Sequence, residues 1–231
     1  MISSDQIAKN YDIAGVRKAN LPGLHMLLLG FFAGMFIALA GAAASVASAD
    51  ITNPSAARIV SALVFPAGLA MVICNGSELF TGNCLMVISL LDHKITFKAL
   101  MKNYLFVYLG NLIGSLFVSV LFVYGHIPGL YDGLLAQNMV NTAVTKVSGK
   151  ILAVYPPISA FVLCGFEHCV ANMFYIPAGM MTASAYGIAA EGLNIGTFIL
   201  NNLIPATIGN IFGGVIVVGC LYWYLFLREK N

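Results

Sequence analysis

The sequence predicts an all-α membrane protein, a bundle of spanning helices built from two related halves. Hydrophobic residues make up 60% of the 231 residues and charged residues only 9%, whereas a soluble domain carries roughly 25% charged residues. Several apolar stretches are long enough to cross a membrane, which takes about 20 residues in a helix. Two short motifs also recur in the same order along the chain. A water-soluble fold is therefore excluded.

The apolar stretches define five predicted spans in one polytopic domain over residues 1–231. Three of them hold no Lys, Arg, Asp or Glu: Leu24–Ala49, Asn103–Leu130 and Gly192–Leu227. The other two hold one acid each: Ile59–Leu91 and Ile151–Ala190. Residues 24–123 then form a first repeat of three spans. Residues 151–227 hold spans five and six of the second repeat.

The first 22 residues are of mixed polarity, and the apolar run after them is too long for a signal peptide. Ser3 and Gln6 have the spacing of a helix capping box. Ile7, Ile13 and Val16 would then share one face of a short helix on the cytoplasmic membrane surface. A solvated N-terminus without such a helix fits the pattern equally well.

The repeat consists of two pairs of motifs. Gly76-x-Glu78-x4-Asn83 recurs as Gly165-x-Glu167-x4-Asn172, and Asn103-x6-Gly110-Asn111-x2-Gly114 recurs as Asn202-x6-Gly209-Asn210-x2-Gly213. Paired repeats with interrupted helices are typical of channels and transporters built from two halves, related in many cases by inversion.

The second half lacks a counterpart of the first span, since no apolar run of that kind lies between Tyr124 and Lys150. Basic residues favour the cytoplasmic side. With a cytoplasmic N-terminus, five spans divide the basic residues six inside and five outside, whereas a further span between Lys146 and Lys150 divides them nine and two. Both observations indicate that a fourth span is missing near Val147–Gly149. A protein with five spans is the alternative.

Glu78 and Glu167 are the two acids inside predicted spans, and they occupy the same position of the repeat. A charge at the centre of a bilayer costs at least about 2.5–3.5 kcal/mol, so neither carboxylate faces lipid. We expect each to stabilise a helix break, together with Asn83 and Asn172, by accepting hydrogen bonds from the N–H groups of that break. A proton or cation site is the other role that fits.

His168 lies in mid-span, whereas the first repeat has Leu79 at the matching position. A buried histidine is often only a core residue, but this asymmetry favours a role in proton exchange with a permeating weak acid. The Thr81 hydroxyl either bonds a carbonyl of its own helix or pairs with His168. Leu79 and Phe161 are ordinary core residues by type. Lys146 is either a solvated lysine outside the membrane or a cation that attracts anions to a pore mouth.

The sequence predicts no cofactor, no metal site and no nucleic-acid partner. The five cysteines lie inside apolar stretches without the spacing of metal ligands, so we expect buried thiols rather than disulfides. A membrane enzyme would need a nucleophile–base pair or a metal cluster, and the spans offer neither. The chain is therefore not expected to be an enzyme.

Three segments resemble the formate/nitrite transporter family: VICNGSELFTG over Val72–Gly82, GFEHCVANM over Gly165–Met173 and NLIPATIGN over Asn202–Asn210. The resemblance implies an aquaporin-like protomer of six spans with its own pore, assembled as a homopentamer in the cell membrane with both termini cytoplasmic. It implies that His168 is the central histidine, Thr81 its partner, Leu79 and Phe161 constriction residues, and Lys146 the anion-attracting lysine.

Two departures from the family pattern matter. The signature of the fourth span is absent, and Ser148-Gly149-Lys150 leads directly into the fifth span. The segment from Thr142 to Lys146 also lacks the histidine that often precedes the lysine in formate channels, which favours the branch that resembles hydrosulfide channels. We expect passage of a small monovalent anion: hydrosulfide, formate or nitrite. The alternative, an aquaporin-like facilitator of small neutral solutes, is disfavoured because both Asn-Pro-Ala boxes are absent.

Overall fold

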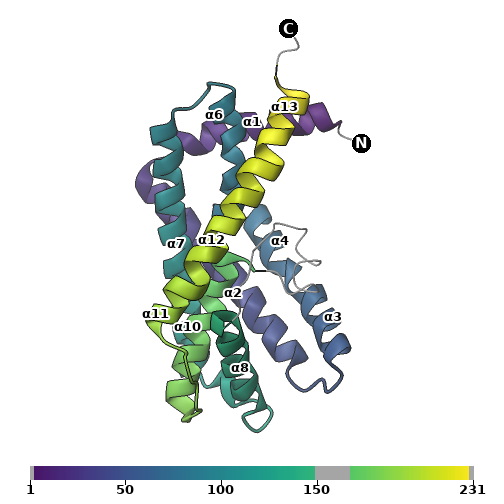
Figure 1. Ribbon diagram of the computed structural model, residues 1–231, viewed down its shortest axis with the longest axis vertical. Coiled ribbons are helices and arrows are strands. Elements are labelled where there is room, and N and C mark those ends of the chain that lie inside the picture. The colour runs from purple at the N-terminus through teal and green to yellow at the C-terminus, as the bar shows by residue number, and fades with distance from the viewer. Residues whose placement is uncertain (1–2, 149–166, 229–231) are drawn as a thin grey trace.

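The structure is a computed structural model that describes residues 3–148 and 167–228, and all regular structure in these ranges is helical. The first half contains α1 (Ser4–Ala19), α2 (Gly23–Ser48), α3 (Pro54–Val64), α4 (Pro66–Cys74), α5 (Phe80–Asn83), η1 (Cys84–Met86), α6 (Val87–Leu91) and α7 (Phe97–Tyr124). The second half contains η2 (Ile127–Gly129), α8 (Leu134–Ser148), α10 (Cys169–Tyr186), α11 (Ile195–Thr197), η3 (Phe198–Leu203), α12 (Ile204–Ile211), η4 (Phe212–Cys220) and α13 (Leu221–Phe226). Figure 1 shows their arrangement.

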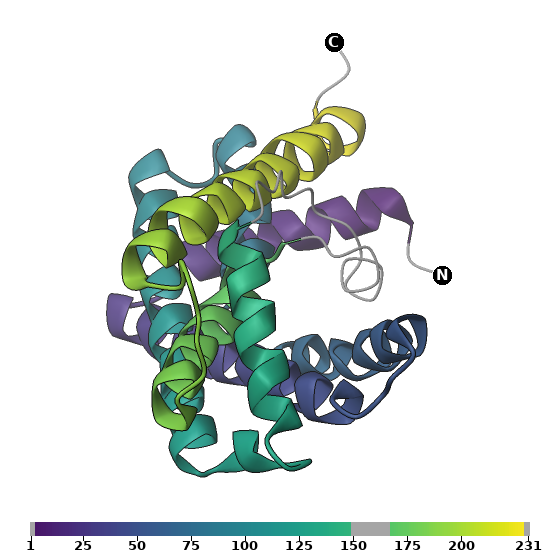
Figure 2. The same cartoon turned by 60° about the horizontal axis from the view of Figure 1, so that its bottom comes forward.

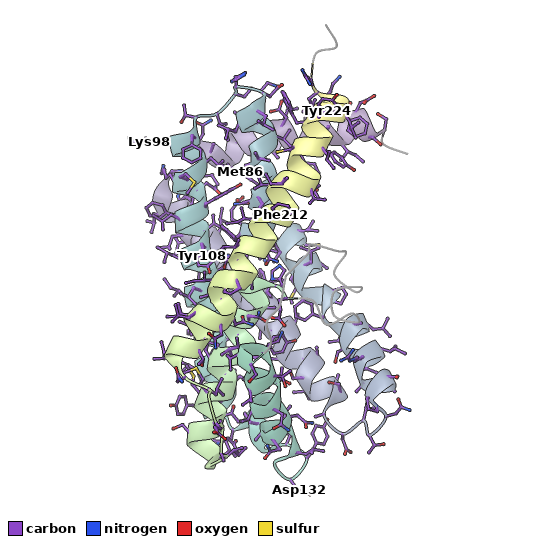
Figure 3. The ribbon with its side chains drawn as sticks, viewed as in Figure 1. Met86, Lys98, Tyr108, Asp132, Phe212 and Tyr224 are labelled. Carbon is purple, nitrogen blue, oxygen red and sulfur yellow. The ribbon has the colours of Figure 1, made fainter. Side chains whose placement is uncertain are left out.

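The membrane fold predicted from composition is confirmed by the length and polarity of the helices. Four helices in the described part of the chain are long and apolar enough to cross a membrane: Gly23–Ser48, Pro54–Cys74, Phe97–Tyr124 and Ile195–Phe226. Apolar side chains cover their outer faces, including Leu105, Ile113 and Phe117 on α7. Phe212 and Tyr224 project from the C-terminal helix in Figure 3. The protein is a multi-pass membrane protein.

The second predicted span is interrupted at the position of its acid. The helix α4 ends at Cys74 and α5 begins at Phe80, and Gly76 between them has φ of +63°. Glycine adopts this left-handed conformation without the steric penalty that a Cβ atom brings. Glu78 therefore lies on non-helical backbone in the middle of the span, as the repeat motif predicted.

The tightest packing in the first half joins α2 to α7 through small residues. A Cβ atom on Gly30 would lie 2.8 Å from the Val107 carbonyl oxygen, and Cβ atoms on Gly34 and Gly114 would overlap the backbone of the opposing helix. Glycines at such positions let two membrane helices approach closely enough for backbone contact. The interrupted span packs against this pair of helices, α4 against α2 and α5 against α7.

The second half differs from expectation between Tyr124 and Lys150. Residues Leu134–Ser148 there form α8, a helix of 15 residues, in a region for which the sequence predicted no span. At 1.5 Å per residue the described part of α8 is about 22 Å long, which is shorter than the roughly 30 Å hydrocarbon core and shorter than α2 with its 26 residues. The start of the predicted fifth span lies in residues 149–166, outside the described ranges, and α10 forms its later part.

The segments that follow the two acids run to opposite ends of the bundle. Figure 1 shows α6 reaching the end where α1 lies, whereas α10 reaches the end where α8 lies. The helix α1 crosses the bundle beside α13 in both Figure 1 and Figure 2, so α1 and α13 share one end.

Polar contacts hold α1 in this position. The buried Asp12 carboxylate pairs with Lys94, and the Ser89 hydroxyl donates to the Asp12 carbonyl oxygen at 2.8 Å. Hydrogen bonds to Asp12 and then to Asp92 raise the pKa of the Lys94 ammonium, which keeps it charged. Of the two alternatives for the N-terminus the structure has the helix, and Ser3 caps it by accepting from the Gln6 N–H at 3.3 Å. The Gln6 side chain bonds Asn10 instead, so only half of the capping box forms.

Candidate pore site

Glu78 is held by a cluster of side chains from three helices. Its carboxylate accepts from Lys18 Nζ of α1 at 3.1 Å and from Asn83 Nδ2 at 2.7 Å. Asn83 Nδ2 also donates to Asn103 Oδ1 at 2.8 Å, while Lys18 Nζ donates to Asn83 Oδ1 at 2.6 Å. Asn103 Nδ2 closes the ring by donating to the Lys18 carbonyl oxygen at 3.3 Å. The buried charge thus has both a counter-ion and a set of hydrogen-bond donors.

Glu167 is held by a second cluster of matching residues with most of the same connections. Lys146 Nζ of α8 donates to its two carboxylate oxygens at 2.9 and 3.0 Å, and Asn172 Nδ2 also donates to this carboxylate. Asn172 Nδ2 bonds Asn202 Oδ1 at 2.7 Å, and Asn202 Nδ2 donates to the Lys146 carbonyl oxygen at 2.8 Å. The two pairs of repeated motifs therefore meet around one lysine in each half.

Lys18 was missed as a member of the repeat, and Lys146 was predicted as a cation at the pore mouth rather than as a counter-ion. The signal was present in the sequence, because each lysine lies in the last turn of a helix N-terminal to its acid. It was weak because the two Lys–Glu separations are 60 and 21 residues. In the first half that interval holds α2, α3 and α4. The second copy is therefore 39 residues shorter (60 minus 21).

The N–H groups at the two breaks have different partners from those expected. Asn111 Oδ1 accepts from the Phe80 N–H and Asn210 Oδ1 from the Cys169 N–H, both at 2.9 Å. Each amide also donates, at 3.0 Å, to the carbonyl oxygen of the acid in its half. The carboxylates themselves bond Lys and Asn side chains in the described contacts. A buried carboxylate needs a counter-ion, which neutral backbone donors do not supply, and the asparagines satisfy the backbone instead.

His168 of the second half and Thr81 of the first half are in contact. Of the two partners considered for the Thr81 hydroxyl, His168 is therefore the one that the structure has. Thr81 Oγ1 lies 3.0 Å from His168 Nε2. His168 is also the N-cap of α10, where its Nδ1 accepts from the Ala171 N–H at 3.2 Å. A nitrogen that accepts carries no proton, so in the neutral ring the proton is on Nε2 and is donated to Thr81.

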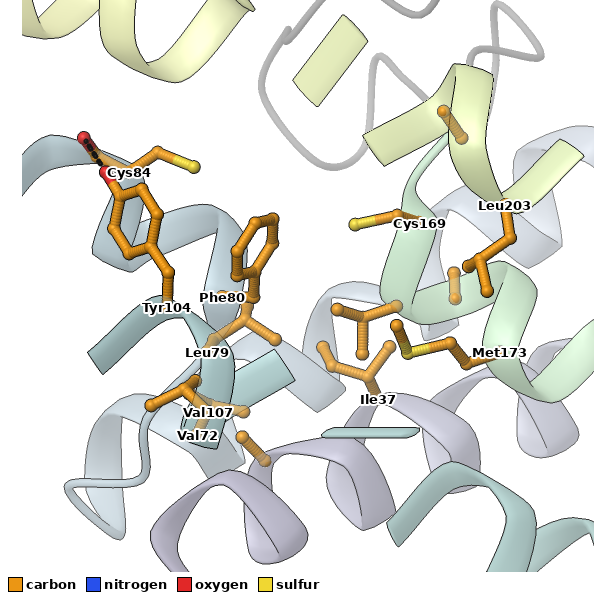
Figure 4. Packing of buried hydrophobic residues seen from close by; sticks show 14 of the residues in the cluster. Ile37, Val72, Leu79, Phe80, Cys84, Tyr104, Val107, Cys169, Met173 and Leu203 are labelled. Carbon is orange, nitrogen blue, oxygen red and sulfur yellow. Dashed lines mark hydrogen bonds between the residues drawn. The ribbon is translucent and has the colours of Figure 1, made fainter. Parts of the chain in front are cut away.

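A cavity of about 330 Å³ connects these groups with α1. Its lining includes Arg17 and Lys18 of α1, Leu79 and Thr81 beyond the first break, and His168. Figure 4 shows Leu79 and Phe80, where the first break meets α5, and Cys169, the first residue of α10, within one hydrophobic cluster. Leu79 is 6% exposed. The other predicted constriction residue, Phe161, lies outside the described residues.

Lys146 lies apart from the groups named as the cavity lining and is largely buried. Its side chain is 18% exposed and its ammonium is paired with Glu167. It also lies 5.5 Å from the centre of the Tyr175 ring. Its predicted role in attracting anions stays a prediction, and the geometry gives it a second role as a counter-ion.

The described residues contain no group of three or more His, Cys, Asp or Glu side chains arranged to hold a metal ion. Cys74, Cys84, Cys169 and Cys220 are free thiols, and Cys164 lies outside the described ranges. The site can therefore donate hydrogen bonds from His168 and Thr81 beside apolar surface, within a cavity that two ion pairs border.

The chain is similar to known channels and transporters over nearly its whole length. It is 32% identical to a probable formate transporter of Methanothermobacter thermautotrophicus, covering 92% of each protein. It is 34% identical to the formate channel FocA of Escherichia coli K12, covering 97% of this chain and 94% of FocA. A solved pentameric formate channel with formate bound superposes with a TM-score of 0.74 at 28% identity, covering 89% of this chain and 98% of that one.

These alignments are longer than the chain. The alignment with FocA runs over 269 positions, so at least 38 of them (269 minus 231) face no residue of this protein. The family model for formate/nitrite transporters matches residues 5–149 and 137–224 as two segments. The match divides where the second repeat is short, and together the segments cover most of the sequence. The chain belongs to the formate/nitrite transporter family, whose members are channels and transporters rather than enzymes.

Proposed function

We propose that this anion channel passes a small monovalent weak-acid anion, such as formate, nitrite or hydrosulfide, across the cell membrane. The observation that carries the proposal is the His168–Thr81 hydrogen bond, which joins the two halves in a cavity bordered by the apolar Leu79. The two relatives described above carry formate in their names, as a transporter and as a channel. Formate is therefore the first anion to test, while the missing histidine before Lys146 keeps hydrosulfide in the comparison.

The physical difficulty for such a channel is desolvation. A bare anion loses far more hydration free energy at an apolar constriction than one dipole returns. His168 and Thr81 lessen this loss by offering hydrogen-bond donors where water is excluded. In the neutral ring, the Nε2–H group can donate to the anion in place of Thr81 without any change of protonation.

Proton exchange, the role expected for His168 from the sequence, also requires that the imidazole ring change its protonation state. The ring would need a second proton on Nδ1, which now accepts from the Ala171 N–H at 3.2 Å. Protonation there places two N–H groups against each other and leaves the Ala171 donor without its acceptor. The geometry supports hydrogen-bond donation by the neutral ring as the resting mode, with proton lending as a costlier second mode.

The assembly and the membrane orientation of the channel are inferred from its structural similarity, the courses of its helices and its basic residues. We infer a homopentamer with a pore in each subunit, because the superposed formate channel is pentameric. The opposite courses of α6 and α10 support an inverted repeat of the aquaporin type. The shared end of α1 and α13 supports termini on one side, and the basic residues Lys9, Arg17 and Lys18 of α1 favour the cytoplasm.

The function is tested by flux through purified protein in liposomes. Formate, nitrite and hydrosulfide are expected to enter at rates well above those of protein-free vesicles, whereas glycerol is expected to stay near the background rate. The reason is that the cavity is bordered by hydrogen-bond donors and cations. Rapid glycerol flux without anion flux would instead establish a facilitator of neutral solutes.

The role of His168 is tested with His168→Asn and His168→Phe. Asn keeps one acceptor for the Ala171 N–H and one donor for Thr81 or the anion, so we expect formate flux to stay within about tenfold of wild type with the same pH profile. Phe removes both groups, and flux is expected to fall close to background. Measurements across about pH 5–8 bracket the ordinary histidine pKa near 6.5. A pH profile flattened by Asn would establish proton lending instead.

The scaffold role of the acids is tested by a double-mutant cycle. Glu167→Gln leaves Lys146 largely buried without its counter-ion, and breaking such a pair destabilises a protein by about 3–5 kcal/mol. The double variant Glu167→Gln with Lys146→Met is expected to recover much of the lost thermal stability in detergent. If each single change and the double change had additive effects, the pair would contribute nothing to stability.

We also infer that one span is missing from the second half. Two observations support a shortfall of this size: the shorter Lys–Glu interval in the second repeat and the long family alignments. A counterpart of α2 would occupy that interval. Sequencing the encoding DNA between the codons of Lys146 and Lys150 is expected to reveal about 39 further codons that include an apolar run of about 20 residues. An uninterrupted reading frame with no such run would show a protein with five spans.

A further inference from the structure

The charges around the cavity do not cancel. Among the described residues that line it, the acidic ones are Glu78 and Glu167, and each is paired with a lysine, Lys18 or Lys146. Each of these pairs is close to neutral as seen from the cavity. One charged side chain then remains among the described lining residues, the guanidinium of Arg17.

Arg17 has the position and freedom that an anion-attracting residue needs. It lies in the last turn of α1, beside Lys18, and it is exposed. It forms no ion pair with any described residue. Among the described residues its charge is therefore uncompensated, and its side chain lines the cavity.

A second observation shows that the same cavity offers an unused hydrogen-bonding group. The Ser77 side chain is 8% exposed and lines the cavity at the first break. Its hydroxyl has no hydrogen-bond partner among the described residues. A buried hydroxyl without a partner is costly, and a bound anion would supply the missing acceptor.

We propose that Arg17 and Ser77 form an anion-capture site at the α1 end of the cavity, ahead of His168. Arg17 raises the local anion concentration, and Ser77 donates a hydrogen bond to an anion that has entered. The ligand class is a small monovalent oxyanion or hydrosulfide, so the site rests on the proposed function. Its charge comes from Arg17 because the ammonium groups of Lys18 and Lys146 are compensated.

The site makes anion entry depend on ionic strength. An exposed cation that lines a cavity with low-dielectric walls raises association rates by about 10–10³-fold. Salt screens this effect, since the Debye length falls from about 30 Å at 0.01 M to about 3 Å at 1 M. A hydrogen bond from the neutral Ser77 hydroxyl lacks this dependence, so the two contributions are separable.

The test compares initial formate influx into liposomes for wild type, Arg17→Glu, Arg17→Lys and Lys98→Glu. Lys98 is the matched control, because it is an exposed lysine at the same end of the bundle but on the outside of α7, away from the cavity (Figure 3). At about 0.01 M ionic strength we expect Arg17→Glu to lower influx by about tenfold. Arg17→Lys and Lys98→Glu are expected to stay within about twofold, and the Arg17→Glu deficit to shrink to about twofold at 1 M salt.

Ser77→Ala is measured in parallel. We expect it to raise the formate concentration for half-maximal influx by about fivefold at both salt concentrations, while Ser77→Thr restores the wild-type value. Each variant is first checked for pentamer assembly, and Arg17→Gln replaces Arg17→Glu if the latter does not assemble.

The outcomes separate this site from the proposed function. If wild type passes formate and Arg17→Glu behaves as Lys98→Glu does, the capture site is overturned while the channel function stands. A deficit of Arg17→Glu that salt does not reduce would also overturn it, because that pattern indicates structural damage. If wild type passes no anion, the proposed function itself fails.

Discussion

The burial of two carboxylates inside a membrane protein is the constraint on which the rest of the structure depends. Glu78 and Glu167 are about 5% and 4% exposed in their side chains, and an uncompensated charge at such depth would not be stable. Each therefore requires a cation and several amide donors. Those groups come from helices distant in sequence, so the ion pairs and their hydrogen bonds connect α1 with α5 and α7, and α8 with α10 and η3.

The interrupted helices are possible because the same framework also satisfies their backbone groups. Non-helical backbone within a bilayer survives only where protein or a water-filled cavity replaces the missing hydrogen bonds. Asn111 and Asn210 do this by bonding one N–H and one carbonyl group at each break. The breaks then hold Thr81 and His168 in fixed positions, so that a polar pair faces the cavity without exposing backbone to lipid.

Symmetry and asymmetry have different functions in this protein. The Lys, Glu and Asn side chains that hold the breaks are repeated in both halves, which suits a framework. The pair that contacts the cavity is not repeated, since His168 stands where the first half has Leu79, and Arg17 precedes Lys18 where Thr145 precedes Lys146. A donor, an apolar surface and a net positive charge thus meet in one cavity because the two halves differ at these positions.

The sequence by itself determined the membrane class, the approximate positions of most spanning helices and the paired motifs, and it singled out His168 by its difference from Leu79. These features depend on local composition, on spacing or on a difference between matched motifs, all of which are visible along the chain. The roles of Lys18 and Lys146 as counter-ions, the capping of the breaks by Asn111 and Asn210, and the Thr81–His168 contact were decided by the tertiary structure. Each joins residues separated by 21 to 87 positions, and only the packing of α1, α7, α8 and the C-terminal helix determines which distant polar groups meet.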